Sequence, residues 1–280
     1  MPYHLQKLYH KNPNSWYNQC MMKLEKTPEN FIEVEGVRFY GSPDKKLSKN
    51  EIYSVDLPLD SELHILRHLS SLEKEFRQKL IGQKMINPYT GQETIINEEY
   101  IDSQISTAGG KFNQEQKRLN SPEKIKEIVI QGAEKIIESK DIQWFRKGKQ
   151  KRCIFSVTFT PELKQNFELD PNIPIGFSNL VKITKELENL TYQKQRGEKE
   201  EADQQATKFI QLENPPATET ITAVFAWFDN RDNPQLFAVH PGIITPPFPN
   251  AKFQSAEELE YNKKFWDQHA FVETKTKTKE

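Results

Sequence analysis

The chain is predicted to be an α+β protein: a small antiparallel sheet of about four strands with flanking helices in the C-terminal half, and a mostly helical and irregular N-terminal region. Two observations predict this class. Residues 220–242 have the pattern of two strands joined by a turn. Residues 121–137 begin with a helix cap and repeat apolar side chains every three or four positions. A helix followed by strands that hairpins or loops join is typical of an antiparallel α+β layer.

The predicted hairpin is the most informative stretch. Residues 220–228 are apolar on both faces, which predicts a central strand covered on both sides. Turn-forming residues follow, and residues 235–240 resume as a strand that Pro241-Gly242 ends, because proline has no N–H for the ladder. His240 is thus expected at a strand end, where scaffolds often hold functional side chains. The alternative is a histidine that only caps the sheet.

The helix over residues 121–137 has a complete start signal. Ser121 is a good N-cap, Pro122 fits the first helical position, and Glu123 complements the helix dipole. The apolar stripe that follows predicts a helix lying on a sheet.

A second helix is predicted over residues 61–80, where leucines recur at helical spacing. His64 and His68 form an i,i+4 pair on it. Such a pair can bind a metal or contact phosphate, whereas the alternative is a solvated or partly packed helix face. A terminal helix is predicted over residues 256–269.

Composition limits the function classes. The net charge of −1 excludes a globally basic nucleic-acid binder and leaves local basic patches open. Cys20 and Cys153 lie far apart without metal-ligand spacing, which argues against a disulfide scaffold or zinc site and fits a cytoplasmic protein. No run approaches the roughly 20 apolar residues of a membrane helix. We expect no cofactor, no metal and no membrane contact.

The polar stretch over residues 86–120 offers few core-forming side chains and predicts a boundary. We therefore divide the chain into an N-terminal accessory region (1–120), an α+β domain with the candidate site (121–272) and a disordered tail (273–280).

A basic turn precedes and enters the strand over residues 152–160. Its sequence is WFRKGKQK, and its aromatic flank suits phosphate and base contacts. The alternative is a solvated hairpin tip. The candidate nucleic-acid-binding residues are Arg146, Lys147, Lys149, Lys151 and Arg152.

Other polar groups are expected at the same site. Ser178 follows the turn at Gly176, and Thr207 and Lys208 lie in a predicted strand. Together with His240 they supply a proton-transfer group, a cation for phosphate and positioning hydroxyls, which metal-independent RNA cleavage through the 2′-hydroxyl requires. A plain turn serine is the alternative for Ser178.

Four runs carry a resemblance to a family of small bacterial proteins that end in an FWxxHA element. They are PIGFSNLV (174–181), ATKFI (206–210), TITAVFAWF…FAVHPG (220–242) and FWDQHAFV (265–272). The layout is similar to that of ribonuclease toxins of the barnase, colicin and RelE type. The resemblance covers residues 121–272 and none of the first 120.

This resemblance implies catalytic roles for Lys208 and His240, with Ser178 and Thr207 as positioning groups. One departure is Phe177, which stands where such a site would carry a basic residue. By the same resemblance, His269 anchors the C-terminal segment.

The sequence therefore predicts a cytoplasmic, toxin-like ribonuclease that cleaves RNA without a metal. Two alternatives remain open. One is a non-catalytic module that binds nucleic acid or protein through the basic turn. The other is an accessory protein whose partner contacts the Tyr/Trp-rich N-terminal region.

Overall fold

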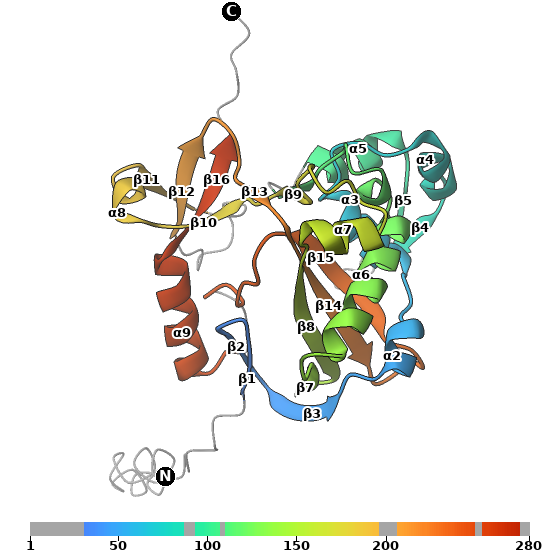
Figure 1. Cartoon of the computed structure of the whole chain (residues 1–280), viewed down its shortest axis with the longest axis horizontal. Helices are drawn as coiled ribbons and strands as arrows, with labels where there is room; N and C mark the ends of the chain where they lie inside the picture. Colours follow the sequence, from blue (N-terminus) through green and yellow to red (C-terminus); the bar gives the residue numbers. More distant parts are fainter. Residues whose placement is uncertain (1–30, 87–92, 107–109, 196–205, 250–253, 275–280) are drawn as a thin grey trace, which may run out of the picture.

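We analysed a computed structural model, which describes residues 31–86, 93–106, 110–195, 206–249 and 254–274 (Figure 1). Two bodies of structure lie side by side. The larger is a five-stranded sheet with helices packed on it, and the smaller is a four-stranded sheet with one long helix below it.

The five-stranded sheet is antiparallel throughout, in the order β15-β14-β8-β7-β3. Its strands are β3 (Ser42–Lys46), β7 (Gln143–Lys147), β8 (Gln150–Thr158), β14 (Thr220–Phe228) and β15 (Gln235–Pro241). β14 is central and mostly buried, as its two-sided apolar sequence predicts. β15 is an edge strand, so Pro241 at its end costs no ladder hydrogen bond.

Helix α6 (Pro122–Ile137) covers one face of this sheet (Figure 1). Its start confirms the cap prediction, because the Ser121 hydroxyl accepts a hydrogen bond from the Lys124 N–H. Gly132 allows α6 to approach β8 closely: a Cβ there would lie 2.7 Å from Val157 Cγ2. The main core lies between this face and the helices of the N-terminal part.

Those helices are short and are separated by small strands. They are α2 (Lys49–Tyr53), α3 (Leu59–Leu66), α4 (Lys74–Leu80) and α5 (Glu98–Ser106), with β4 (Lys84–Ile86) paired to β5 (Glu93–Ile95). The hairpin of β1 (Phe31–Val34) and β2 (Val37–Tyr40) supplies apolar residues to a second core, which also contains Ile154 of β8. Glu35 and Gly36 both have positive φ, as the favoured two-residue hairpin turn requires.

The four-stranded sheet has the order β10-β16-β12-β11. Its strands are β10 (Leu180–Lys182), β11 (Thr191–Gln195), β12 (Ala206–Leu212) and β16 (His269–Thr274), accompanied by α8 (Lys185–Glu188) and α9 (Ala256–Asp267). β12 and β16 run parallel. The remaining elements are β6 (Lys111–Phe112), the 3₁₀ turn η1 (Lys117–Leu119), α7 (Pro161–Asn166), β9 (Gly176–Phe177) and β13 (Ala217–Thr218); β6, β9 and β13 form a three-stranded sheet.

The predicted fold class was wrong in its architecture. The sequence suggested about four strands in one C-terminal sheet and a mostly helical and irregular N-terminal region, but the structure has several sheets, and β1 to β6 all lie before residue 121. The edge strand β3 has the sequence SPDKK and every one of its residues is exposed. Edge strands carry lysine and proline because these discourage pairing with other chains, and such a strand has no apolar alternation to detect. Through β3, the five-stranded sheet includes strands from both sides of the boundary proposed near residue 120.

The prediction of one helix over residues 61–80 was also wrong. α3 ends at Leu66, a turn follows, and α4 begins at Lys74. The spaced leucines that predicted the helix are nevertheless buried, including Leu69 in the turn. The apolar spacing predicted correctly which side chains are buried, but it did not show that the helix is interrupted between α3 and α4. The break is important because it leaves His68 in the turn.

Gly176 of β9 lies where two backbones approach closely. A Cβ there would be 2.5 Å from the Lys111 carbonyl oxygen and 2.8 Å from Pro241 Cβ. We expect Gly176→Ala to lower the free energy of unfolding by about 1–3 kcal/mol, because backbone atoms must move to admit the methyl group. Urea unfolding measures this. Gly110→Ala is the matched control, since its nearest contact would be 3.4 Å, and equal midpoints for the two variants would contradict the prediction.

Within the part of the chain that the structure describes, no helix has the length and apolar character to cross a membrane.

Candidate functional site

Three of the six histidines of the chain lie together beside the edge strand β15. His64 belongs to α3, His68 lies in the turn after it, and His240 lies near the end of β15. The ring centroids of His64 and His68 are 5.5 Å apart, and those of His68 and His240 are 5.9 Å apart. We call these three residues the histidine cluster.

Backbone carbonyls fix the tautomers of two of these rings. His68 Nδ1 lies 2.8 Å from the Gly110 oxygen, and His240 Nδ1 lies 3.3 Å from the Pro241 oxygen. A carbonyl oxygen only accepts, so in the neutral ring the proton is on Nδ1. Nε2 of each ring therefore keeps its lone pair and can accept a proton.

Burial keeps the cluster neutral. It lowers the pKa of His64 to about 4, and Arg67 and His240 add to that effect. Burial likewise brings the pKa of His68 well below its usual value and lowers the pKa of His240. Each side chain is still partly exposed to solvent. At neutral pH the cluster therefore offers uncharged imidazoles, which suits them to act as general bases.

Lys111 positions the turn that carries His68. Its ammonium group donates to the carbonyl oxygens of Arg67 (2.6 Å), Leu69 (3.1 Å) and Ile105. Burial lowers the pKa of Lys111 to about 8. The His68 carbonyl oxygen in turn accepts from the Phe112 N–H at 2.8 Å. These hydrogen bonds hold the C-terminal ends of α3 and α5 next to β6.

Arg67 provides an exposed positive charge close to the cluster. Its Nε donates to Gln104 Oε1 at 3.0 Å, and its charge is one of the influences on the pKa of His64. An exposed guanidinium beside neutral imidazoles can attract a phosphate group. Among the described residues, no group of three or more His, Cys, Asp or Glu side chains is arranged to hold a metal ion.

Ser178 lies near this site but is engaged in local structure. Its hydroxyl donates to the Leu180 carbonyl oxygen at 3.0 Å and accepts from the Leu180 N–H at 3.1 Å. A Cβ on Gly242 would lie 2.8 Å from Ser178 Oγ, so Ser178 packs against the bend that follows His240. The structure thus places Ser178 against the bend that follows His240, with its hydroxyl bonded to the backbone of Leu180.

Lys208 and Thr207 lie in β12 of the other sheet. The Lys208 ammonium donates to the Asp267 carbonyl oxygen at 2.6 Å, at the C-terminal end of α9, where a positive charge is favourable. Thr207 pairs with Lys194 of β11, and its side chain falls outside the described residues. The structure does not bring these two residues to His240.

The basic residues of the β7–β8 hairpin are mostly paired. The ion pairs are Arg146–Asp229 (2.9 Å), Lys147–Glu258 (2.5 Å) and Lys151–Asp44 (2.7 Å). The Arg152 guanidinium lies 5.5 Å from the centroid of the Phe237 ring, and Lys149 is exposed in the turn. Gln150, beside this turn, pairs with Phe228 at one end of β14. His240 pairs with Thr222, which lies near the other end of β14. The hairpin and the histidine cluster are therefore separate regions.

Sequence reasoning found His240 and noticed the His64/His68 spacing, but it did not connect them. It also missed Lys111 and the carbonyl of Gly110. A usable signal was present for Lys111 alone, since it follows the glycine pair of the polar stretch over residues 86–120, and polar residues at such breaks often hold turns together.

His269 lies at the junction of α9 and β16. Its ring stacks on Phe265 at 4.0 Å between centroids, and its Nδ1 lies 2.7 Å from the Phe265 carbonyl oxygen. It joins α9 to β16 and lies away from the cluster.

Comparisons with known proteins give no family. No protein-family model matches the chain, and no curated protein matches it. One solved structure that is similar is the crystal structure of a conserved hypothetical protein from Toxoplasma gondii ME49. It is 13% identical, with a TM-score of 0.35, over 55% of this chain and 86% of that one. At that TM-score the likeness supports no conclusion about this chain, and its fold and candidate site rest on its own residues.

Proposed function

We propose that the protein cleaves RNA without a metal, by acid–base catalysis at the histidine cluster. The observation that carries the proposal is the pairing of His240 with His68, at 5.9 Å between ring centroids, with Nε2 of each ring able to accept a proton. Attack of a 2′-hydroxyl on its own phosphate needs one group to remove a proton and one to protonate the leaving oxygen. Two neighbouring imidazoles can divide these tasks.

The low pKa values of the histidine cluster suit an imidazole that acts as the general base. Without substrate, they disfavour a protonated imidazole that could act as the general acid. A bound phosphate changes this, because a negative charge within about 4–6 Å stabilises an imidazolium and raises its pKa. In this proposal, substrate binding creates the acid: the phosphate protonates one ring, while the other stays neutral as the base. Arg67 provides the charge that draws the phosphate toward them.

The direct test is incubation of the purified protein with total RNA and with a defined oligoribonucleotide in excess EDTA. We expect cleavage that leaves a 2′,3′-cyclic phosphate, and no cleavage of the DNA oligonucleotide of the same sequence, because DNA has no 2′-hydroxyl. Intact RNA at high protein concentration would contradict the proposal. Cleavage of both nucleic acids, or loss of cleavage in EDTA, would point to a different chemistry.

A second candidate is a non-catalytic module that binds nucleic acid or protein. It is favoured by the same low pKa values, since a neutral cluster has no proton to give at neutral pH. The dependence of binding on salt distinguishes its possible partners. Nucleic-acid binding weakens steeply with salt because bound counterions are released, whereas a weak salt dependence would favour a protein partner.

A further inference from the structure

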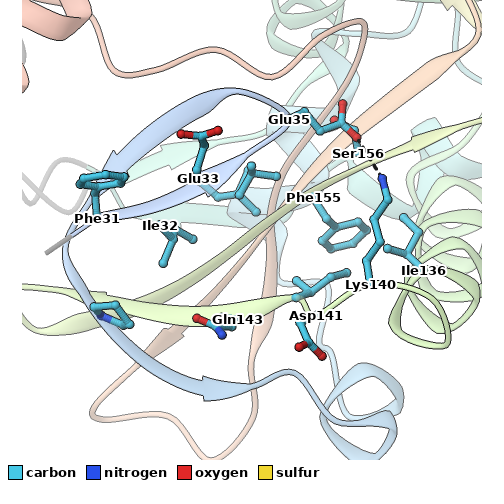
Figure 2. A pocket seen from close by; sticks show the side chains of 14 residues that line it. Phe31, Ile32, Glu33, Glu35, Ile136, Lys140, Asp141, Gln143, Phe155 and Ser156 are labelled. Carbon is cyan, nitrogen blue, oxygen red and sulfur yellow. Dashed lines mark ion pairs between the residues drawn. The ribbon is translucent and has the colours of Figure 1, made fainter.

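A cavity of about 470 Å³ lies where β7 and β8 separate. Figure 2 shows its walls: the β1–β2 hairpin on one side, the chain that leaves α6 on the other, and β8 between them. Its volume falls in the range of roughly 300–1,000 Å³ that is usual for small-molecule sites. The histidine cluster adjoins β15, on the far side of β14, so the cavity is separate from the proposed catalytic site.

One edge of β8 is open at this cavity. The ladder between β7 and β8 ends at the pair of Phe145 and Arg152, whereas β14 pairs with β8 as far as Thr158. Among the described strands, none pairs with β8 after Arg152 on the side of β7. The β8 residues that line the cavity belong to this unpaired part.

The pairing pattern shows which backbone groups face that edge. The Phe159 N–H donates to the Glu219 oxygen at 2.8 Å, in register with the β8–β14 ladder. In an antiparallel ladder, successive residues direct their N–H and C=O groups to opposite sides. The residues two and four positions before Phe159 therefore bond to β14 as well, and Ile154 and Ser156 direct their N–H and C=O groups to the open edge. The cavity thus has hydrogen-bond donors and acceptors side by side.

The Ser156 side chain adds an acceptor. Ser156 is buried and its hydroxyl lies 2.9 Å from that of Thr222. Thr222 donates its single hydroxyl proton to the Gly242 oxygen at 2.7 Å, so the Ser156 hydroxyl must be the donor to Thr222. Ser156 Oγ keeps lone pairs with which to accept a hydrogen bond from a group in the cavity.

The charges around the cavity are balanced. Three carboxylates of the lining each have a cation as partner: Glu33–Arg38 (3.9 Å), Glu35–Lys140 (3.9 Å) and Asp141–Lys46 (2.7 Å). Lys140 is the one cation among the described lining residues, and it belongs to one of these pairs. An ionised group is costly to bury without a partner of opposite charge. The lining therefore favours a neutral ligand.

The space beside the open edge is short. At one end, β7 already pairs with β8 from Arg152 onward. At the mouth, the ion pair of Glu35 and Lys140 joins the turn of the β1–β2 hairpin to the chain after α6 (Figure 2). An added peptide strand would meet β7, whereas a compact molecule fits between these limits. Because both side chains of the pair are exposed, the pair contributes little and can open to admit a ligand.

We propose that this cavity binds a neutral, largely apolar small molecule that contains a cyclic amide, or a heterocycle with the same adjacent donor and acceptor. The ligand N–H donates to a carbonyl oxygen of the open edge, and the ligand oxygen accepts from an N–H of that edge. The rest of the ligand contacts the aliphatic walls. These walls are formed by Ile32, Val34, Ile136, Ile142 and Ile154. Apolar walls with a few fixed polar groups are the usual composition of a ligand site.

Amide NMR of the wild-type protein with carbostyril, a neutral bicyclic cyclic amide, tests the proposal. In the free protein, the Ile154 and Ser156 amides should exchange with solvent faster than those of Phe155 and Val157, which bond to β14. We expect saturable binding of carbostyril at millimolar concentration. It should shift the Ile154 and Ser156 amide signals and slow the exchange of these two amides.

Changes to the probe test its hydrogen bond and its charge. N-methylcarbostyril has no donor and should bind about tenfold more weakly, because a carbonyl oxygen of the open edge is then left without its partner. Carbostyril with an added carboxylate or ammonium group should also bind about tenfold more weakly, since the cavity offers no free charge to either.

Protein variants locate the binding. Val34→Phe places a ring in the cavity and should weaken carbostyril binding about tenfold, because the ring occupies the space of the ligand. The matched control is Val181→Phe in β10, at a partly buried strand position of the other sheet, and it should leave the affinity unchanged.

The proposal is overturned if carbostyril does not bind, if the amide shifts lie outside the cavity, or if the N-methylated or a charged form binds as tightly. It is also overturned if Val181→Phe has the same effect as Val34→Phe. The comparison of probes needs only the wild-type protein, so it decides the matter even if Val34→Phe fails to fold.

Discussion

Replacing His240 by alanine is expected to lower the rate of RNA cleavage by about 10²–10⁴-fold, which is the usual contribution of a general acid or base. The affinity for RNA should change little, because the exposed charge of Arg67 remains. His240 lies in the edge strand β15, where its ring is beside that of His68. Single-turnover cleavage at saturating protein separates the chemical step from binding.

His68→Ala should have an effect of the same size, and the double variant should be scarcely slower than either single variant, since the two rings act as one unit. The matched control is His269→Ala. His269 is also buried and stacked, but it joins α9 to β16 away from the cluster, so this variant should lose stability and keep its cleavage rate once folded. A wild-type rate in both His240→Ala and His68→Ala would place any catalysis outside the histidine cluster.

The elements that the sequence predicted well are those whose own residue pattern shows which of their faces are apolar. β14 is apolar on both faces, and α6 has both a cap and a continuous apolar stripe, so each can be located without knowledge of its neighbours. β3 could not be located in this way, because it is a charged, exposed edge strand that exists only through its pairing with β7. Part of the error in the predicted architecture comes from this strand, which joins the N-terminal part of the chain to the five-stranded sheet.

The candidate site, too, could be predicted from the sequence only in part. His240 was predictable from its position before Pro241-Gly242. Its neighbours were not, because the contact with His68 joins residues far apart in the chain and depends on how α3 packs beside β15. Residue type alone also did not show where Lys208 would lie: a lysine beside a hydroxyl in a strand resembles a phosphate site, and in the structure its ammonium group donates to the carbonyl oxygen at the end of α9. Tertiary packing, which no local pattern encodes, decided both cases.

Acidification is expected to destabilise the protein through the histidine cluster. The folded state holds the pKa of His64 at about 4, against roughly 6.5 for an unfolded chain. The unfolded state thus binds a proton first as the pH falls, so stability is full above pH ~6.5 and declines toward pH ~4. Between about pH 7.5 and pH 4.5, His64 alone should remove about 2–3 kcal/mol of the free energy of unfolding, at 1.36 kcal/mol per unit of pKa.

Urea unfolding of the wild type and of His64→Gln over this pH range measures the effect. Other groups also titrate: the depressed pKa values of Glu51 and Asp44 reduce stability at low pH in both proteins, and the raised pKa of Glu62 acts in the opposite direction. The informative quantity is therefore the difference between the two curves, in which the contributions of these three carboxyl groups cancel because His64 does not shift the pKa of any of them. We expect the loss on acidification to be about 2–3 kcal/mol smaller in His64→Gln. Parallel curves would mean that His64 is solvated when folded, and the cluster would then lack the burial that holds its imidazoles neutral for the proposed chemistry.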